Sequence, residues 1–173
     1  AGLPGMRERT ITLGGFSKNY AMTGWRVGYI AAPSGLLEGM MKVHQYVMMS
    51  APTTAQFAAL EALVSGEEPL ITMRDEYDRR RRLMYRGFNQ IGLPCIEPLG
   101  AFYAFPNITP TGMDDETFAE QLLLEERVAV VPGSAFGEGG RGHVRACYAT
   151  SYSDIERALD RIQHFVSTRV GAK

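Results

Sequence analysis

Cysteine, histidine and long apolar runs are scarce in this sequence of 173 residues. Its 2 cysteines, Cys95 and Cys147, form no Cys-x-x-Cys pair, and its 3 histidines stand far apart. We therefore expect no metal site and no redox motif, and a reducing cytoplasm is the simplest setting. No apolar run approaches the roughly 20 residues that a membrane-spanning helix needs, and the first residues lack the layout of a secretory signal. Membrane insertion and export are not expected.

An excess of charge of one sign is also lacking, because the net charge is -1. This near-neutral balance gives no electrostatic reason to expect nucleic acid or an anionic membrane as a partner. One local run of like charge, Arg79–Arg82, falls in a segment of helical pattern. Successive helical residues point about 100° apart, so the run predicts a solvated, ion-paired helix rather than one basic face. The apolar share of 45% is that of an ordinary globular domain.

The most informative stretch runs from Gly14 to Gly28. Its lysine, Lys18, follows Ser17 and has apolar and aromatic neighbours in sequence. A lysine that loses part of its hydration in a folded cleft favours the neutral amine, the form that attacks carbonyl carbons and builds Schiff bases. Arg26 stays charged and offers a planar fork for phosphate or carboxylate. One reactive amine and one anion-binding group therefore share a short segment.

A nucleotide-binding phosphate loop and a plain surface lysine are the alternatives for this stretch. Gly14-Gly15 and Ser17-Lys18 contain the residue types of a phosphate loop. That loop requires the lysine before the hydroxyl residue, however, and here the order is reversed. Lys18 alone would be an ordinary surface lysine, and only its register with the glycines and the arginine favours a functional role.

The same stretch resembles the lysine motif of class I and II aminotransferases, pyridoxal-phosphate enzymes of fold type I. In that family the pattern reads Ser-x-Ser-Lys and then Gly-x-Arg, and here it reads Gly15–Lys18 and then Gly24–Arg26. The resemblance implies that Lys18 is the catalytic residue, forms the Schiff base and thereby binds the cofactor. It also implies that Arg26 binds the cofactor phosphate.

One position departs from the family pattern. Gly15 stands where the first serine, a phosphate ligand in many members, is expected. Its backbone N–H can still donate to a phosphate, but the hydroxyl is lost. The resemblance therefore leaves Gly15 and Ser17 as further cofactor-binding residues, with Ser17 as the side-chain donor.

Arg145 is the candidate for binding substrate. It lies in an alternating stretch, so Arg145 faces one side while its neighbours face the other. Taken alone, a surface salt bridge is the simpler interpretation. The stretch 142–149 resembles the family's strand that carries its substrate arginine, which implies that Arg145 binds the substrate α-carboxylate. Phe102 and Tyr103 fit equally well beside the substrate side chain or in the core.

Helical and strand-like segments alternate along the chain, which predicts an α/β fold of packed layers. The apolar residues of 36–49 are too many for one helix face, so we expect that helix to be covered on several sides. Capping boxes are predicted at Thr53 to Gln56 and at Ser153 to Glu156. The helix after the second box is predicted to bury one apolar face, which consists of Ile155, Ala158, Leu159, Ile162, Phe165 and Val166. The expected strands are 9–13, 26–32, 95–98, 101–105, 128–131 and 143–149, and the expected helices are 36–49, 53–65, 69–91, one from 114 onward and one from 153 onward.

The resemblance runs in order from about residue 9 to residue 166, and in the family the lysine lies past the middle of the chain. It implies that this sequence is the C-terminal part of a longer protein. Residues 1–35 would be a remnant of the large cofactor-binding domain, 36–66 linking helices, and 67–173 a small C-terminal domain of helices on a short mixed sheet. The family's ring-stacking aromatic and the aspartate at the ring nitrogen would lie upstream, so we expect little or no activity from these residues alone.

The function implied is that of an amino acid aminotransferase, a transferase of amino acid metabolism that uses pyridoxal 5'-phosphate. It would exchange amino groups between amino acids and 2-oxo acids, and the full-length protein would form a homodimer in the cytoplasm. Lyases that act on the same scaffold, carbon–sulfur lyases among them, are an alternative. A second is the aminotransferase-like sensor domain of a transcription regulator, and a third is a structural module that has lost activity. The sequence leaves the substrate side chain open.

Overall fold

The computed structural model describes residues 1–170, and residues 171–173, the last of the expected small domain, lie outside the described residues. The chain divides into two compact units, Ala1–Met73 and a second that begins at Arg74. The expected division at residues 35 and 66 stays a prediction. Within residues 1–170, no helix is long and apolar enough to cross a membrane.

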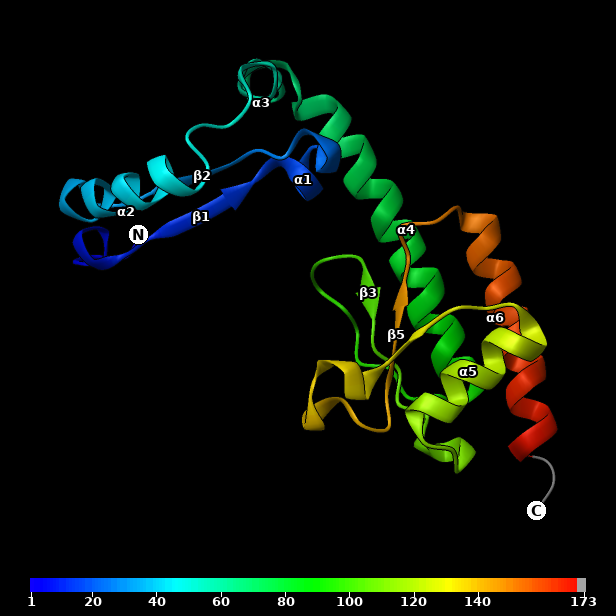
Figure 1. Cartoon of the computed structure of the whole chain (residues 1–173). Coiled ribbons are helices and arrows are strands. Elements are labelled where there is room, and N and C mark those ends of the chain that lie inside the picture. Colours follow the sequence, from blue (N-terminus) through cyan, green and yellow to red (C-terminus); the bar gives the residue numbers. More distant parts are fainter. Residues whose placement is uncertain (171–173) are drawn as a thin grey trace. The chain divides into compact units, whose positions relative to one another are not determined.

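The first unit contains an antiparallel hairpin followed by helices (Figure 1). The hairpin register runs from the pair Thr12↔Ala31 to the pair Gly15↔Gly28. The first strand starts later than expected because Arg7–Arg9 forms a 3-10 turn. The Thr10 hydroxyl donates a hydrogen bond to the carbonyl of Met6 across this turn. The elements of this unit are β1 (Thr12–Gly15), α1 (Phe16–Asn19), β2 (Gly28–Ala31), α2 (Ser34–Val47), α3 (Thr53–Ser65) and the start of α4 (Glu67–Ile91).

The predicted capping box at Thr53 was wrong. α3 begins at Thr53 itself, directly after Pro52, and no side chain caps its first turn. The fixed backbone angle of proline favours a helix start at the next residue, which places Thr53 inside the helix. Gln56 instead donates from Nε2 to the carbonyl of Ala51.

The first unit has a small core. Phe16, Met22 and Ala59 form its buried cluster. No residue of α2 is buried by the described residues, although its apolar pattern predicts cover on several sides. Large apolar side chains are therefore exposed on α2 and α3, among them Tyr46 and Phe57.

The second unit packs helices on a three-stranded sheet of order β3-β5-β4 (Figure 1). This confirms the α/β fold class, but the sheet is antiparallel throughout rather than mixed. β3 and β4 run in the same direction, yet β5 lies between them and pairs antiparallel with each, so no parallel ladder forms. Beyond α4, the elements are β3 (Tyr103–Ala104), α5 (Asp115–Glu126), β4 (Val131–Pro132), β5 (Val144–Cys147) and α6 (Tyr152–Val170).

One face of this sheet and three helices enclose the main core. Ala104 of β3 and Val144 and Ala146 of β5 are buried on that face. The apolar face predicted for α6 is confirmed, because Ile155, Leu159, Ile162, Phe165 and Val166 are all buried. The core is completed by Met84 and Phe88 of α4, Phe118 and Leu122 of α5, and Tyr148 after β5.

Several predicted boundaries shift by a few residues, among them those of α6 and β4. α6 begins at Tyr152, and its capping serine is Ser151 rather than Ser153. Ser151 Oγ accepts a hydrogen bond of 3.1 Å from the backbone N–H of Asp154, and it donates to the Asp154 carboxylate. Strand 128–131 starts only at Val131, because Val128 donates its N–H to Leu122 and so closes the end of α5.

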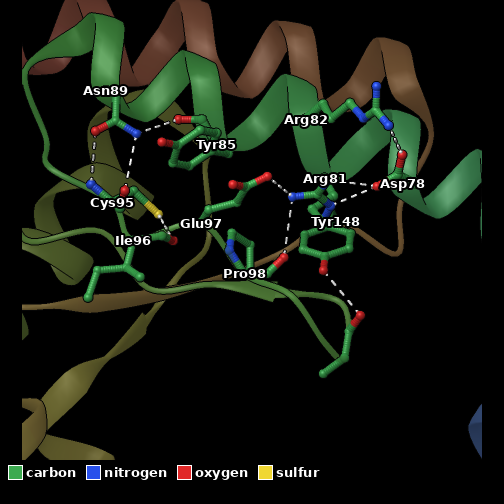
Figure 2. A network of polar contacts seen from close by, with 11 residues as sticks. Asp78, Arg81, Arg82, Tyr85, Asn89, Cys95, Ile96, Glu97, Pro98 and Tyr148 are labelled. Atoms are coloured by element: carbon green, nitrogen blue, oxygen red, sulfur yellow. Dashed lines mark hydrogen bonds and ion pairs between the residues drawn. The ribbon is translucent and has the colours of Figure 1, made fainter.

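Residues 95–98 form no strand, because side chains of α4 hold this segment (Figure 2). Asn89 bonds both backbone groups of Cys95, accepting its N–H and donating to its carbonyl, each at 3.2 Å. Further along, Arg81 pairs with Glu97 at 2.6 Å and with Asp78 at 2.7 Å. Side chains therefore make hydrogen bonds to the backbone of this segment that a neighbouring strand would otherwise make.

The arginine run on α4 is ion-paired, as predicted. Arg79 and Arg80 both contact Glu76, and Arg82 contacts Asp78. The two guanidinium groups at Glu76 lower the pKa of that carboxyl to about 2 by hydrogen bonding. The run therefore forms intrahelical pairs rather than one basic surface.

Candidate active-site loop and substrate arginine

The connection between β1 and β2 carries the cofactor-binding residues expected from the sequence. The pair Gly15↔Gly28 closes its base. Ser17 and Lys18 lie on α1, which starts directly after Gly15, and Arg26 stands just before β2. Sequence reasoning placed these residues in one strand-to-strand loop, and the structure has that loop.

Buried anchors fix the loop to the first unit. Phe16 and Met22 are 5% and 7% exposed and pack with Ala59 of α3. The carbonyl of Phe16 accepts the N–H groups of Tyr20 and Met22 at 3.2 and 3.3 Å. Because its start and its middle are anchored, the loop displays α1 on a supported scaffold.

Ser17 and Lys18 are adjacent on α1 but differ in exposure to solvent. Ser17 is half-buried, and its carbonyl accepts a hydrogen bond of 2.9 Å from the Thr23 hydroxyl. Lys18 is exposed. These 170 residues alone therefore do not remove the amine from solvent, which the sequence argument required of a folded cleft.

Arg26 has an unusual backbone. Its φ of 53° and ψ of 50° lie in the left-handed region, which costs a non-glycine residue about 1–2 kcal/mol. Its Nη1 donates to the carbonyl of Thr23 at 2.8 Å, which fixes one edge of the guanidinium. The remaining donors stay available to an anion, since the side chain is exposed.

The space beside Gly15 is open. A Cβ added to this residue would meet no atom within 4 Å, and the backbone there is extended, with φ -147°. The loop thus carries an amine, a guanidinium and a hydroxyl within one connection, and it has free volume at Gly15. This donor set fits an aldehyde that carries a phosphate, as pyridoxal 5'-phosphate does.

Arg145 lies in the second unit, on β5. As the alternation predicts, its neighbours Val144 and Ala146 are buried on the core face and Arg145 is half-buried on the other face. Its Cζ lies 4.4 Å from the ring centroid of Tyr103 and 4.6 Å from that of Phe136. No salt bridge to a carboxylate is found for Arg145 among residues 1–170.

Phe102 and Tyr103 contact each other at a centroid distance of 4.7 Å but have different further neighbours, and their place relative to a substrate stays a prediction. Phe102 packs against the core and stacks with Tyr77 at a centroid distance of 6.0 Å. Tyr103 contacts the guanidinium of Arg145 instead. Sequence reasoning missed Phe136, because its spacing from Arg145 matches no local period.

Asp115 was also missed. It is 3% exposed, and its carboxylate accepts the backbone N–H of Ser134 at 2.7 Å and that of Gly142 at 3.4 Å. These bonds, the one from Ser134 foremost, lower its pKa to about 2. Its signal was the doubled Asp114-Asp115: Asp114 alone caps α5 by accepting the N–H of Thr117, which leaves the second carboxylate for another role.

Among residues 1–170, no group of His, Cys, Asp and Glu side chains is arranged to hold a metal ion.

The family model for aminotransferase class I and II matches residues 3–162. The chain belongs to this family. The match covers both the loop of Lys18 and the strand of Arg145, so the resemblance of the separate motifs extends over most of the chain.

Similar proteins and solved structures support the assignment to this aminotransferase family. An aspartate aminotransferase of Pyrococcus abyssi is 50% identical over 94% of this chain and 42% of its own length. An aromatic-amino-acid aminotransferase of Thermococcus litoralis is 47% identical over 94% of this chain and 42% of its own length. The crystal structure of an aromatic aminotransferase from Pyrococcus horikoshii has a TM-score of 0.93 at 49% identity and covers 98% of this chain and 46% of that one. The chain thus spans less than half the length of these relatives.

Proposed function

We propose that the protein is an amino acid aminotransferase that uses pyridoxal 5'-phosphate and moves an amino group from an amino acid to a 2-oxo acid. One observation carries the proposal: the β1–β2 loop of a chain in this family presents Lys18, Ser17 and Arg26 together. Aspartate and aromatic aminotransferases among its relatives support the reaction class, and the substrate side chain stays open.

Each residue has a role that follows from its chemistry. When bound, the cofactor supplies an aldehyde carbon that captures amines and a ring that accepts an electron pair. Lys18 would attach through Nζ to that carbon, while Arg26 and Ser17 would donate hydrogen bonds to the phosphate. Gly15 would leave room for the phosphate, because a Cβ there would meet no atom within 4 Å, and its backbone N–H would donate to the phosphate.

Substrate binding and proton transfer would complete the reaction. Arg145 would bind the α-carboxylate with two parallel N–H···O bonds, a geometry that lysine does not reproduce. Nζ of Lys18, released when the substrate amine replaces it, would accept the proton from the substrate Cα and then donate it to the carbon that was the cofactor's aldehyde carbon. The amino acid would react first and leave as its 2-oxo acid, and a second 2-oxo acid would then take up the amino group.

Covalent trapping tests the assignment of Lys18. The chain with added pyridoxal phosphate is reduced with borohydride, digested and mapped by mass spectrometry. The sequence has lysine at positions 18, 42 and 173 only, and Lys173 lies outside the described residues. We expect the label on Lys18 and its loss in Lys18→Ala but not in Lys42→Ala. Equal labelling of Lys42 would contradict a specific site.

Full-length protein tests the reaction. We expect transamination in the cytoplasmic, homodimeric full-length enzyme and little or none from the 173 residues alone. Lys18→Ala should abolish turnover in the full-length protein, and retained turnover would reject the proposal. Release of ammonia and pyruvate instead of aminated product would show a lyase on the same scaffold.

A further inference from the structure

The guanidinium of Arg145 is held by two aromatic rings rather than by a carboxylate. Its Cζ lies over the rings of Tyr103 and Phe136, at 4.4 and 4.6 Å from their centroids. By contrast, Arg81, another half-buried arginine of this unit, forms ion pairs with the carboxylates of Asp78 and Glu97. The faces of the two rings attract the guanidinium of Arg145, and these contacts do not use its N–H donors.

The ladder explains how Tyr103 reaches this position. Tyr103 pairs with Cys147 across β3 and β5, and Ala104 pairs with Ala146. Ala104 and Ala146 are buried, so Tyr103, Cys147 and Arg145 share the opposite face. Tyr103 and Arg145 are diagonal neighbours there, within reach of long and aromatic side chains.

Phe136 reaches the guanidinium from a separate, firmly anchored loop. The loop follows β4, and the carboxylate of Asp115 binds the backbone at both of its ends, Ser134 and Gly142. At its base, Gly133 donates its N–H to His143 at 2.8 Å. Phe136 itself is 50% exposed and touches Phe105 edge to face, so its ring is not part of the core.

We propose that Phe136 and Tyr103 are positioning residues, which hold the Arg145 guanidinium in one orientation so that its N–H edge receives a carboxylate. A guanidinium donates along its edge, and ring contacts made through Cζ leave that edge open. A side chain that is already ordered loses less conformational freedom when it binds. This inference rests on the proposed role of Arg145 and adds the residues that prepare it.

Carboxylate binding by the 173-residue chain tests the inference. The chain is labelled with 15N-arginine, the Nε–Hε signal of Arg145 is assigned by its loss in Arg145→Lys, and acetate is titrated with acetamide as the neutral control. We expect acetate alone to shift the signal. In Phe136→Leu, acetate should bind about three- to tenfold more weakly, and rotation about the Nε–Cζ bond should become faster. Phe136→Tyr, which keeps the ring, should retain most of the affinity and the slow rotation.

Folding is monitored separately by the backbone amide spectrum, which a half-exposed ring should leave largely unchanged. Wild-type affinity and rotation in Phe136→Leu, while acetate still binds to Arg145, would overturn the positioning role alone. An Arg145 signal that acetate does not shift in the wild-type chain would reject the carboxylate role of Arg145, and this inference with it. The two failures are therefore distinguishable.

Discussion

The hydroxyl of Tyr148 donates a hydrogen bond of 3.1 Å to the carbonyl oxygen of Ala101, at the turn that leads into β3. Tyr148 is 1% exposed, whereas Ala101 is exposed and has a left-handed φ of 57°. The bond therefore joins the core to a turn in an unfavourable backbone conformation. That turn directly precedes Phe102 and Tyr103, so the bond helps to place the ring that contacts Arg145.

Tyr148→Phe should remove this bond while keeping the buried ring. We expect a loss of about 1 kcal/mol in the free energy of unfolding, because water can still reach the exposed carbonyl of Ala101. Urea unfolding measures the difference. Tyr46→Phe is the matched control, since Tyr46 is 90% exposed and should show no change. An unaltered urea midpoint in Tyr148→Phe would show that the turn holds without the hydroxyl.

Asp115→Asn should destabilise the loop that carries Phe136. The amide group offers one acceptor where the carboxylate offers two, so an N–H of Ser134 or Gly142 would lose its partner, at a cost of about 2 kcal/mol. Chemical unfolding near neutral pH measures this loss. Asp160→Asn, an exposed position on α6, serves as the control and should behave as the wild type.

The same carboxylate should contribute to the acid sensitivity of the fold. Its pKa falls from an ordinary value of 3.8 to about 2 on folding, chiefly through the bond from Ser134. A group with a lowered folded-state pKa stabilises above its unfolded pKa, and that stability is lost as the pH falls through the folded pKa. We expect the stability gap between wild type and Asp115→Asn to narrow from about pH 4 down to about pH 2. A gap that stays constant over this range would argue against an ionised Asp115.

Gly133→Ala should be among the most damaging substitutions in the second unit. A Cβ at Gly133 would lie 1.9 Å from the carbonyl oxygen of Gly140 and 2.7 Å from that of His143, both backbone atoms that cannot swing aside. We expect a loss of at least about 3 kcal/mol in unfolding free energy. Gly139→Ala, in the same loop and with no atom within 4 Å, should be close to neutral. Thermal unfolding of the two variants side by side gives the comparison.

Gly15→Ser should tighten binding of pyridoxal phosphate. The open space and extended backbone at Gly15 accept a side chain, and a hydroxyl there would restore the serine of the family pattern. A hydrogen bond to a charged phosphate is worth about 1.5–3 kcal/mol, so we expect affinity to rise by roughly tenfold or more. Absorbance titration measures the dissociation constant. Gly35→Ser, at an open position on α2, should leave it unchanged. Weaker binding in Gly15→Ser would place the phosphate elsewhere.

Features that depend on neighbours close along the chain could be predicted from the amino-acid sequence. The register of Lys18 with Arg26 indicated the family, and the charges of Arg79–Arg82 predicted an ion-paired helix. The spacing of Ile155, Leu159 and Ile162 predicted the buried face of α6. Each is a local pattern, because helical and strand periods repeat within a few residues.

Contacts between distant segments could not be predicted in this way and are seen only in the folded chain. Asn89 of α4 bonds the backbone of Cys95, where the sequence predicts a strand. Asp115 binds the backbone of Ser134, 19 residues further on, and Phe136 contacts the guanidinium of Arg145. None of these follows a period, since each arises when packing of the core brings separate elements together and leaves buried polar groups to be satisfied. The candidate site residues could therefore be found from local motifs, whereas the contacts that position them depend on the tertiary fold.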